Sequence, residues 1–157
     1  MPKIQDFEEL ICWQKSRELV NEIYSISNDG DFSRDFELKN QTRRAAISIM
    51  SNIAEGFGRY HKKEFVRFLD IAQSSASELK SQLYIALDQN YITKEQFSII
   101  SVSTNNVRKL IFGLVRYLKN YDRPGGSVKE PESEYSVEGT LNASYSIPEN
   151  FIDPDTI

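Results

Sequence analysis

The chain has 157 residues, of which 39% are hydrophobic, with 23 acidic and 19 basic side chains and a single cysteine. This length fits one domain, and no stretch approaches the roughly eighteen consecutive apolar residues of a membrane span. Residues 1–6 lack the basic start and apolar run of a secretory signal, and the lone Cys12 cannot form an internal disulfide. We therefore expect a cytoplasmic protein that does not cross a membrane.

The net charge of −4 is unevenly distributed along the chain. Residues 1–121 carry 17 basic and 15 acidic side chains, a net charge of +2, whereas residues 122–157 carry 2 and 8, a net charge of −6. Four of the five prolines also lie after residue 121. We expect a folded domain over residues 1–121 and an acidic tail over residues 122–157, which its composition predicts to be flexible.

The first half of the domain predicts two helices. The first is expected to begin at Asp6, with Glu9 completing a capping box, and to end at residues 28–31. The second is expected to run from residue 36 or 37 to Glu55, with Gly56 placed to terminate it. Their apolar residues recur at steps of three and four, as in helices that bury one face.

The third helix has the most regular pattern, because its apolar residues alternate steps of four and three from Phe65 to Ala86. Thr93 and Gln96 form a second capping-box pattern, which opens a fourth helix extending to Tyr121. Short connections force neighbouring helices to be antiparallel. The sequence therefore predicts an all-α, up-and-down four-helix bundle.

Two of these helices carry a second apolar face. A helix with apolar residues on two faces is usually buried on both, and in a chain this short the second face is expected to meet another subunit. We therefore predict a homo-oligomer. The residues of this second face are Ile99, Val102, Leu110, Phe112 and Val115 in the fourth helix, and Ile47 and Met50 in the second.

The second helix has an unusual polar pattern. Arg43 lies among apolar residues, where a charge is unusual unless it borders a contact surface. Asn52 lies beside the core face, where its amide needs a hydrogen-bond partner if it is buried. A polar line along the same helix consists of Arg44, Ser48, Ser51 and Glu55.

The run from Arg43 to Arg59 reads RRAAISIMSNIAEGFGR. It resembles the signature of a bacterial four-helix-bundle family whose founding members are encoded in intervening sequences of large-subunit ribosomal RNA genes, a family also labelled ribosomal-protein-like. Residues 13–16 resemble the tryptophan-containing start of that family's first helix, and residues 65–79 resemble the start of its third. The resemblance covers about residues 7–121. Met50 departs from it, because a proline is common at that position.

The resemblance implies an up-and-down bundle and homopentamers around a central channel, as in the distantly similar accessory proteins of diversity-generating retroelements. Those accessory proteins bind RNA and a reverse transcriptase through basic surface residues. No catalytic activity is implied. We therefore predict a non-enzymatic homopentamer that associates with ribosomal RNA through a basic rim. The alternative is a protein-interaction scaffold, in which the oligomer surface and the tail bind a protein partner and nucleic acid has no role.

Basic residues in and after the motif are the candidate RNA contacts, because guanidinium and ammonium groups bind phosphates. For the arginines, the alternative is that they pair with Glu55, Asp70 or a carboxylate of a neighbouring subunit and hold the oligomer together. Phe57 and Tyr60 either stack on bases or pack in the core or an interface, and packing is the favoured interpretation. The candidate nucleic-acid-binding residues are Arg43, Arg44, Arg59, Lys62 and Lys63, and the structural residues of the motif are Trp13, Asn52, Glu55 and Gly56.

Residue types that support catalysis or metal binding are scarce. Cys12 and His61 are the only soft metal ligands, which is too few for a zinc site, and a single histidine cannot supply the paired Glu-x-x-His motifs of a di-iron bundle. Ser48 and Ser51 have no base at hand for nucleophilic catalysis. We predict no metal, no cofactor and no enzymatic activity.

Overall fold

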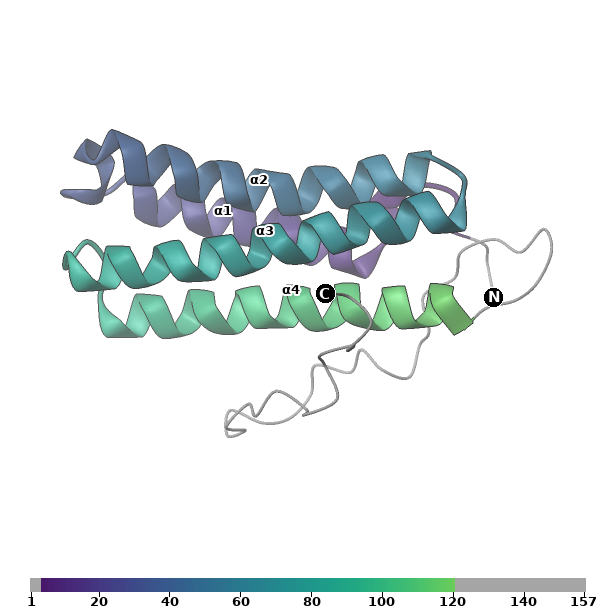
Figure 1. Cartoon of the computed structure of the whole chain (residues 1–157). Coiled ribbons are helices and arrows are strands. Elements are labelled where there is room, and N and C mark those ends of the chain that lie inside the picture. Colours follow the sequence, from purple (N-terminus) through teal and green to yellow (C-terminus); the bar gives the residue numbers. More distant parts are fainter. Residues whose placement is uncertain (1–3, 121–157) are drawn as a thin grey trace, which may run out of the picture.

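The protein is described by a computed structural model over residues 4–120, in which the helices run antiparallel to their neighbours along the chain (Figure 1). No strand occurs within these residues. The prediction of an all-α four-helix bundle is confirmed, whereas the expected acidic tail over residues 122–157 lies outside the described residues. The elements are η1 (Phe7–Glu9), α1 (Ile11–Ser27), η2 (Phe32–Arg34), α2 (Phe36–Gly58), α3 (Lys62–Asp88) and α4 (Lys94–Asn120), where η denotes a 3-10 turn.

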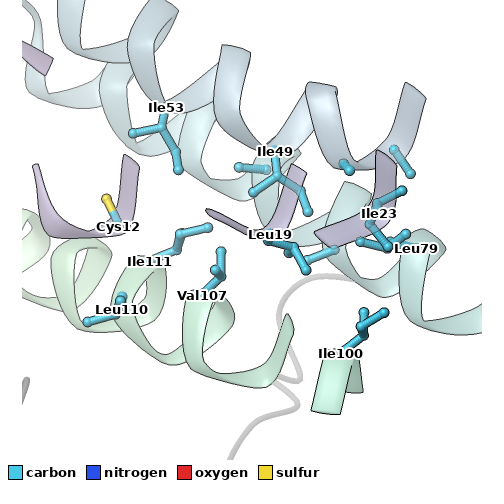
Figure 2. Packing of buried hydrophobic residues seen from close by; sticks show 14 of the residues in the cluster. Cys12, Leu19, Ile23, Ile49, Ile53, Leu79, Ile100, Val107, Leu110 and Ile111 are labelled. Atoms are coloured by element: carbon cyan, nitrogen blue, oxygen red, sulfur yellow. The ribbon is translucent and has the colours of Figure 1, made fainter. Parts of the chain in front are cut away.

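The helices form a four-helix bundle in which each helix packs against two others: α1 on α2, α2 on α3, α3 on α4, and α4 on α1. The most extensive of these contacts joins α2 and α3. Each helix contributes fully buried side chains to one core, including Ile23, Ile49, Leu79 and Ile111, whose positions between the helices are visible in Figure 2. Since α3 and α4 have 27 residues each, the bundle is about 40 Å long.

The prediction that the first helix begins at Asp6 is wrong. The Asp6 carboxylate accepts a hydrogen bond from Phe7 N (2.7 Å) and caps the short turn η1. Leu10 then adopts an extended backbone (φ −70°, ψ 123°) that separates η1 from α1. The Glu9 carboxylate accepts a hydrogen bond from Gln5 N (3.3 Å), so it does not complete a capping box with Asp6. The polar residues therefore start a single turn, and α1 begins only at Ile11.

Gly56 does not terminate α2, which is a second correction to the sequence-based prediction. The helix continues to Gly58, with Arg59 as its C-cap. Gly56 is buried inside the helix, because a Cβ there would lie 2.6 Å from Phe68 Cβ and 2.9 Å from Phe65 Cδ2. This glycine is therefore required by the close approach of α3 and not by a turn.

The predicted second apolar face of α4 is only partly exposed. Leu110 and Val115 are 4% and 7% exposed, so they belong to the core, and their assignment to a subunit contact is wrong. α4 packs against both α1 and α3, so some of its turns bury more than one residue in the core. The other α4 members of the predicted face, Ile99, Val102 and Phe112, are exposed. On the predicted second face of α2, Ile47 is exposed and Met50 is half-buried.

The capping box predicted at the start of α4 is confirmed. Thr93 Oγ1 accepts a hydrogen bond from Gln96 N (3.1 Å), and Gln96 Oε1 accepts one from Thr93 N (2.9 Å). At the same end of the bundle, Tyr91 donates its phenolic hydrogen to Asp35 Oδ2 (3.0 Å). This hydrogen bond raises the pKa of Tyr91, because it stabilises the protonated phenol.

No helix in the described part of the chain is long and apolar enough to cross a membrane.

Candidate nucleic-acid interface

The basic residues predicted to contact RNA fall into two separate groups. Arg43 and Arg44 lie in the first half of α2, whereas Arg59, Lys62 and Lys63 lie at the connection between α2 and α3. From Arg43 to Arg59 the helix advances about 24 Å. The structure therefore does not bring the five side chains together within one chain. Figure 1 shows the α2–α3 connection at the same end of the bundle as the end of α4.

Arg43 anchors the end of α1. Its Nε donates a hydrogen bond to Ser27 Oγ (2.8 Å), and its Nη2 donates one to Asn28 Oδ1 (2.8 Å). The guanidinium also lies over the ring of Tyr24, 4.3 Å from the ring centroid. These contacts explain why a charged residue occurs among apolar neighbours, since Arg43 fastens α2 to the last turn of α1. Its donors are directed into the protein, towards a hydroxyl and an amide oxygen and not towards the carboxylates named in the alternative.

Arg59 forms the internal ion pair that was considered as an alternative to phosphate contact. Its Nη2 lies 2.9 Å from Glu55 Oε1, one helical turn away, and both side chains are about half-exposed. A solvent-exposed pair at this spacing contributes only about 0.3–0.5 kcal/mol. The guanidinium is therefore easily redirected towards a phosphate. Arg44, in the other group, is exposed on α2.

A second arginine joins Arg59 at the α2–α3 connection. The guanidinium groups of Arg59 and Arg67 lie 5.3 and 4.7 Å from the centroid of the Phe68 ring, which is 6% exposed. Arg67 also pairs with Glu64 (3.1 Å). Hydrogen bonding by Arg67 lowers the pKa of the Glu64 carboxyl, so this carboxylate stays ionised. Arg67 was not among the predicted site residues.

Lys62 and Lys63 occupy the first turn of α3, and both are exposed. His61 precedes them as the N-cap and is also exposed, as predicted for a loop histidine. Within residues 4–120, no three His, Cys, Asp or Glu side chains are grouped to hold a metal ion. The connection therefore presents cationic groups of lysine and arginine to solvent.

Tyr60 lies in the middle of this cationic connection and is 90% exposed. Its φ of 58° is in the left-handed region, which is unfavourable for a bulky side chain. The interpretation of Tyr60 as a core residue is therefore wrong. Each of the three connections between consecutive helices contains one residue with positive φ. It is Gly30 between α1 and α2, Tyr60 between α2 and α3, and Asn90 between α3 and α4. Those are the residue types that tolerate this conformation, so Tyr60 is the exception.

The polar residues of the motif join α2 to α3. Ser48 Oγ lies 2.8 Å from Ser75 Oγ, and Asn52 Nδ2 donates to Ser48 O (2.8 Å) and to Ser48 Oγ (3.0 Å). The Asn52 amide thus has the partner that the sequence required. Together with the close approach at Gly56, this hydrogen-bonded group makes the motif a helix-packing element.

Two other aromatic residues singled out from the sequence, Trp13 and Phe57, are packed. Trp13 lies edge-on to Phe7 with centroids 5.0 Å apart and packs against the core. Phe57 lies edge-on to Phe65 with centroids 6.0 Å apart. Phe57 is therefore a packing residue, as favoured from the sequence. Tyr60, in contrast, projects into solvent.

Two features of this site were missed or misassigned from the sequence. The exposure of Tyr60 depends on where α2 ends, and α2 extends past the glycine that was expected to stop it. Arg67 pairs with Glu64, three residues earlier in α3, and its guanidinium lies over the ring of the adjacent Phe68. The spacing of Glu64 and Arg67 was the available signal for this second cation.

The similarity of the chain to known proteins agrees with this structure. No curated protein is significantly similar in sequence. One solved structure, described as a protein of unknown function from the S23 ribosomal protein family of Bacteroides thetaiotaomicron VPI-5482, superimposes with a TM-score of 0.62 at 26% sequence identity. The match covers 68% of this chain and 99% of that chain. Residues 8–113 match the family described as 23S rRNA-intervening sequence protein, so the chain belongs to this family.

Proposed function

We propose that the protein is a non-enzymatic, cytoplasmic homo-oligomer that binds ribosomal RNA through the connection between α2 and α3. The observation that carries this proposal is Tyr60, an aromatic side chain held in solvent by an unfavourable backbone conformation and flanked by cations. Strained residues of this kind are often retained for function, and an exposed ring among basic residues suits stacking on an unpaired base. The family name supplies the choice of ribosomal RNA as ligand.

The cationic side chains around Tyr60 are suited to phosphate contact. We name this group, consisting of Arg59, Tyr60, Lys62, Lys63 and Arg67, the connection cluster. Glu64, the one acidic residue between Arg59 and Arg67 in the sequence, already pairs with Arg67. Arg43 is not included, because its donors hold the end of α1. The RNA proposal therefore rests on one end of the bundle.

Oligomerisation would repeat the connection cluster and strengthen weak phosphate contacts by multivalency. A ring needs two different contact surfaces on each subunit. On α2, Phe36 and Ile47 are 69% and 40% exposed, and on α3, Ile71 and Ile85 are 37% and 47% exposed. We propose that these two surfaces meet between neighbouring subunits of a homopentamer.

RNA binding is tested by fluorescence anisotropy with labelled fragments of 23S ribosomal RNA that contain unpaired loops. Tyr60→Ala removes the ring, while alanine has the same unfavourable fit to a positive φ as tyrosine. We expect the affinity for RNA to fall about 5- to 100-fold, as for the loss of one stacked base. Tyr60→Phe keeps the ring and should bind as the parent protein does. Lys63→Glu should weaken binding and flatten its dependence on salt.

Arg34→Glu is the matched control for charge, because Arg34 is exposed in η2. This turn belongs to the connection between α1 and α2, which lies at the end of the bundle opposite the α2–α3 connection (Figure 1). The RNA proposal fails if no binding occurs at about 50 mM salt, or if Arg34→Glu weakens binding as much as Lys63→Glu. Capture of a protein partner without RNA affinity would instead favour the scaffold alternative.

Subunit number is tested separately by light scattering and native mass spectrometry. Ile47→Asp and Ile85→Asp should each dissociate the oligomer, because each places a charge on one of the two proposed surfaces. A monomeric parent protein would contradict the oligomer but not the RNA contact, since the connection cluster lies within one chain.

A further inference from the structure

The two arginines of the connection cluster rest on one aromatic ring. The Cζ atoms of Arg59 and Arg67 lie 5.3 and 4.7 Å from the centroid of the Phe68 ring. Whichever faces of the ring they cover, the two guanidiniums are therefore no more than about 10 Å apart. Phe68 is itself buried and in close contact with Gly56, so its ring is a fixed support for both cations.

Each of these arginines also has a carboxylate partner on its own helix. Arg59 lies 2.9 Å from Glu55, and Arg67 lies 3.1 Å from Glu64. All four side chains are about half-exposed, so solvent and ligands reach them. Residues 55–67 contain four basic and two acidic side chains, a net charge of +2. The surface therefore keeps an excess of cations after both ion pairs have formed.

The two ion pairs affect which kind of phosphate can bind. A phosphodiester carries one negative charge, as a carboxylate does, so exchanging Glu55 or Glu64 for a diester at an exposed arginine gains little free energy. A phosphomonoester carries about −1.5 to −2 charges at pH 7 and offers three acceptor oxygens. It therefore binds arginine more strongly than the carboxylate it displaces, and the two half-exposed guanidiniums can turn towards it together.

The aromatic content of the connection cluster limits how many bases it can hold. Tyr60 is its one aromatic member and is 90% exposed. Proteins that hold the interior of a single strand stack successive bases on several aromatic side chains. One ring serves one base, and a single base beside an additional negative charge is found at the phosphorylated end of a strand.

We propose that the connection cluster binds a terminal phosphomonoester of single-stranded RNA, with Arg59 and Arg67 on the phosphate and Tyr60 stacked on the terminal base. Lys62 and Lys63 then contact the next phosphates of the strand. This inference rests on the proposed RNA contact and names the part of the RNA that is recognised. The same chemistry occurs in a free nucleoside monophosphate, which the experiment must distinguish from an RNA end.

The first test is a competition assay at fixed salt with short RNAs of one sequence that carry a 5′-phosphate, a 3′-phosphate or only hydroxyl ends. We expect one phosphorylated form to bind about 2- to 20-fold more tightly than the hydroxyl form, as for one or two additional exposed ion pairs. The hydroxyl RNA lengthened by one nucleotide is the control for charge. It adds one diester charge and should gain less affinity than the phosphorylated RNA does.

The outcomes separate this inference from the proposed function. Equal binding of phosphorylated and hydroxyl RNA would overturn the terminal-phosphate site and leave RNA binding in place. Competition by adenosine 5′-monophosphate as strong as that by phosphorylated RNA would support the phosphomonoester site but make a free nucleotide its ligand, against the RNA function. Absence of binding to all of these probes would overturn both.

The second test uses variants of the two arginines. Arg59→Gln with Arg67→Gln should abolish the preference for the phosphorylated end and leave weaker binding through Tyr60 and the lysines. Lys63→Gln should weaken the binding of both RNAs alike and keep the preference. A preference that survives the loss of both arginines would place the phosphate elsewhere and overturn the assignment.

The third test removes the competing carboxylates. Glu55→Gln with Glu64→Gln should tighten the binding of hydroxyl RNA, because its phosphodiesters no longer compete with carboxylates for the arginines. Glu78→Gln is the matched control, since Glu78 is exposed on α3 and bonds to Gln82. It should leave the affinity unchanged. If the double variant behaves as this control does, the carboxylates do not select the ligand and that part of the inference is wrong.

Discussion

Gly56 of α2 and Phe68 of α3 touch so closely that a Cβ on Gly56 would lie 2.6 Å from Phe68 Cβ. This contact sets the separation of the two helices at the end where the candidate interface lies. It also fixes Phe68, over whose ring Arg59 and Arg67 are placed. The glycine in the family motif therefore acts on the site through helix packing.

Replacing Gly56 by alanine should destabilise the protein by about 1–2 kcal/mol, because the strain of an overpacked contact exceeds the gain in helix propensity. Gly58→Ala is the matched control, since a Cβ there meets nothing within 4 Å. The control should be neutral or slightly stabilising. Urea unfolding of both variants measures the difference, and equal midpoints would show that α3 can move away from α2 without loss.

Arg43→Ala should lower the free energy of unfolding by about 1–3 kcal/mol, because two hydrogen bonds from a charged group to the end of α1 are lost. Arg44→Ala, at the neighbouring exposed position, should change it by less than about 0.5 kcal/mol. Thermal unfolding of the two variants tests the assignment of Arg43 to structure. If Arg44→Ala were the more damaging change, the anchoring role of Arg43 would be wrong.

Tyr60→Gly should stabilise the protein by about 0.5–1 kcal/mol, because glycine adopts the positive φ of this position without steric conflict. The same change should reduce RNA affinity, since the exposed ring is removed. Asn90→Gly is the control for stability and should have a smaller effect, because asparagine already tolerates this conformation. A loss of stability in Tyr60→Gly would show that the ring packs against the protein.

Glu22 makes stability depend on pH. Its Oε1 accepts a hydrogen bond from Ser103 Oγ (3.1 Å), and its Oε2 is buried without a hydrogen-bond partner in the described chain. Burial raises the pKa of Glu22 above its ordinary value of 4.5. The folded protein therefore favours the neutral carboxyl, and this contribution to stability is complete below pH 4.5 and is lost as the pH rises through the folded-state pKa.

Glu22→Gln should consequently be more stable than the parent protein at neutral pH, by a few tenths of a kcal/mol, because solvent screens a carboxyl that is not fully buried. The advantage should shrink below pH 4.5, where Glu22 itself is neutral. Unfolding free energies measured across this range test the sign.

The sequence by itself determined the helical class, the approximate helix boundaries and the antiparallel arrangement. Periodic apolar residues and caps such as Thr93 with Gln96 are local signals, and they act within one or two turns of the chain. The motif from Arg43 to Arg59 also indicated the family, and part of this motif serves the packing of α2 on α3. The close approach at Gly56 and the contact between Ser48 and Ser75 belong to this packing.

Only the tertiary structure decided which face each residue serves. Arg43 points to the end of α1, Leu110 and Val115 lie in the core, and Tyr60 stands in solvent. The outcomes for Arg43, Leu110 and Val115 depend on a neighbouring helix, so spacing within one helix could not reveal them. The outcome for Tyr60 depends on where α2 ends. Gly56 illustrates the reason: a glycine can end a helix or admit a second helix, and the position of Phe68 selects between the two.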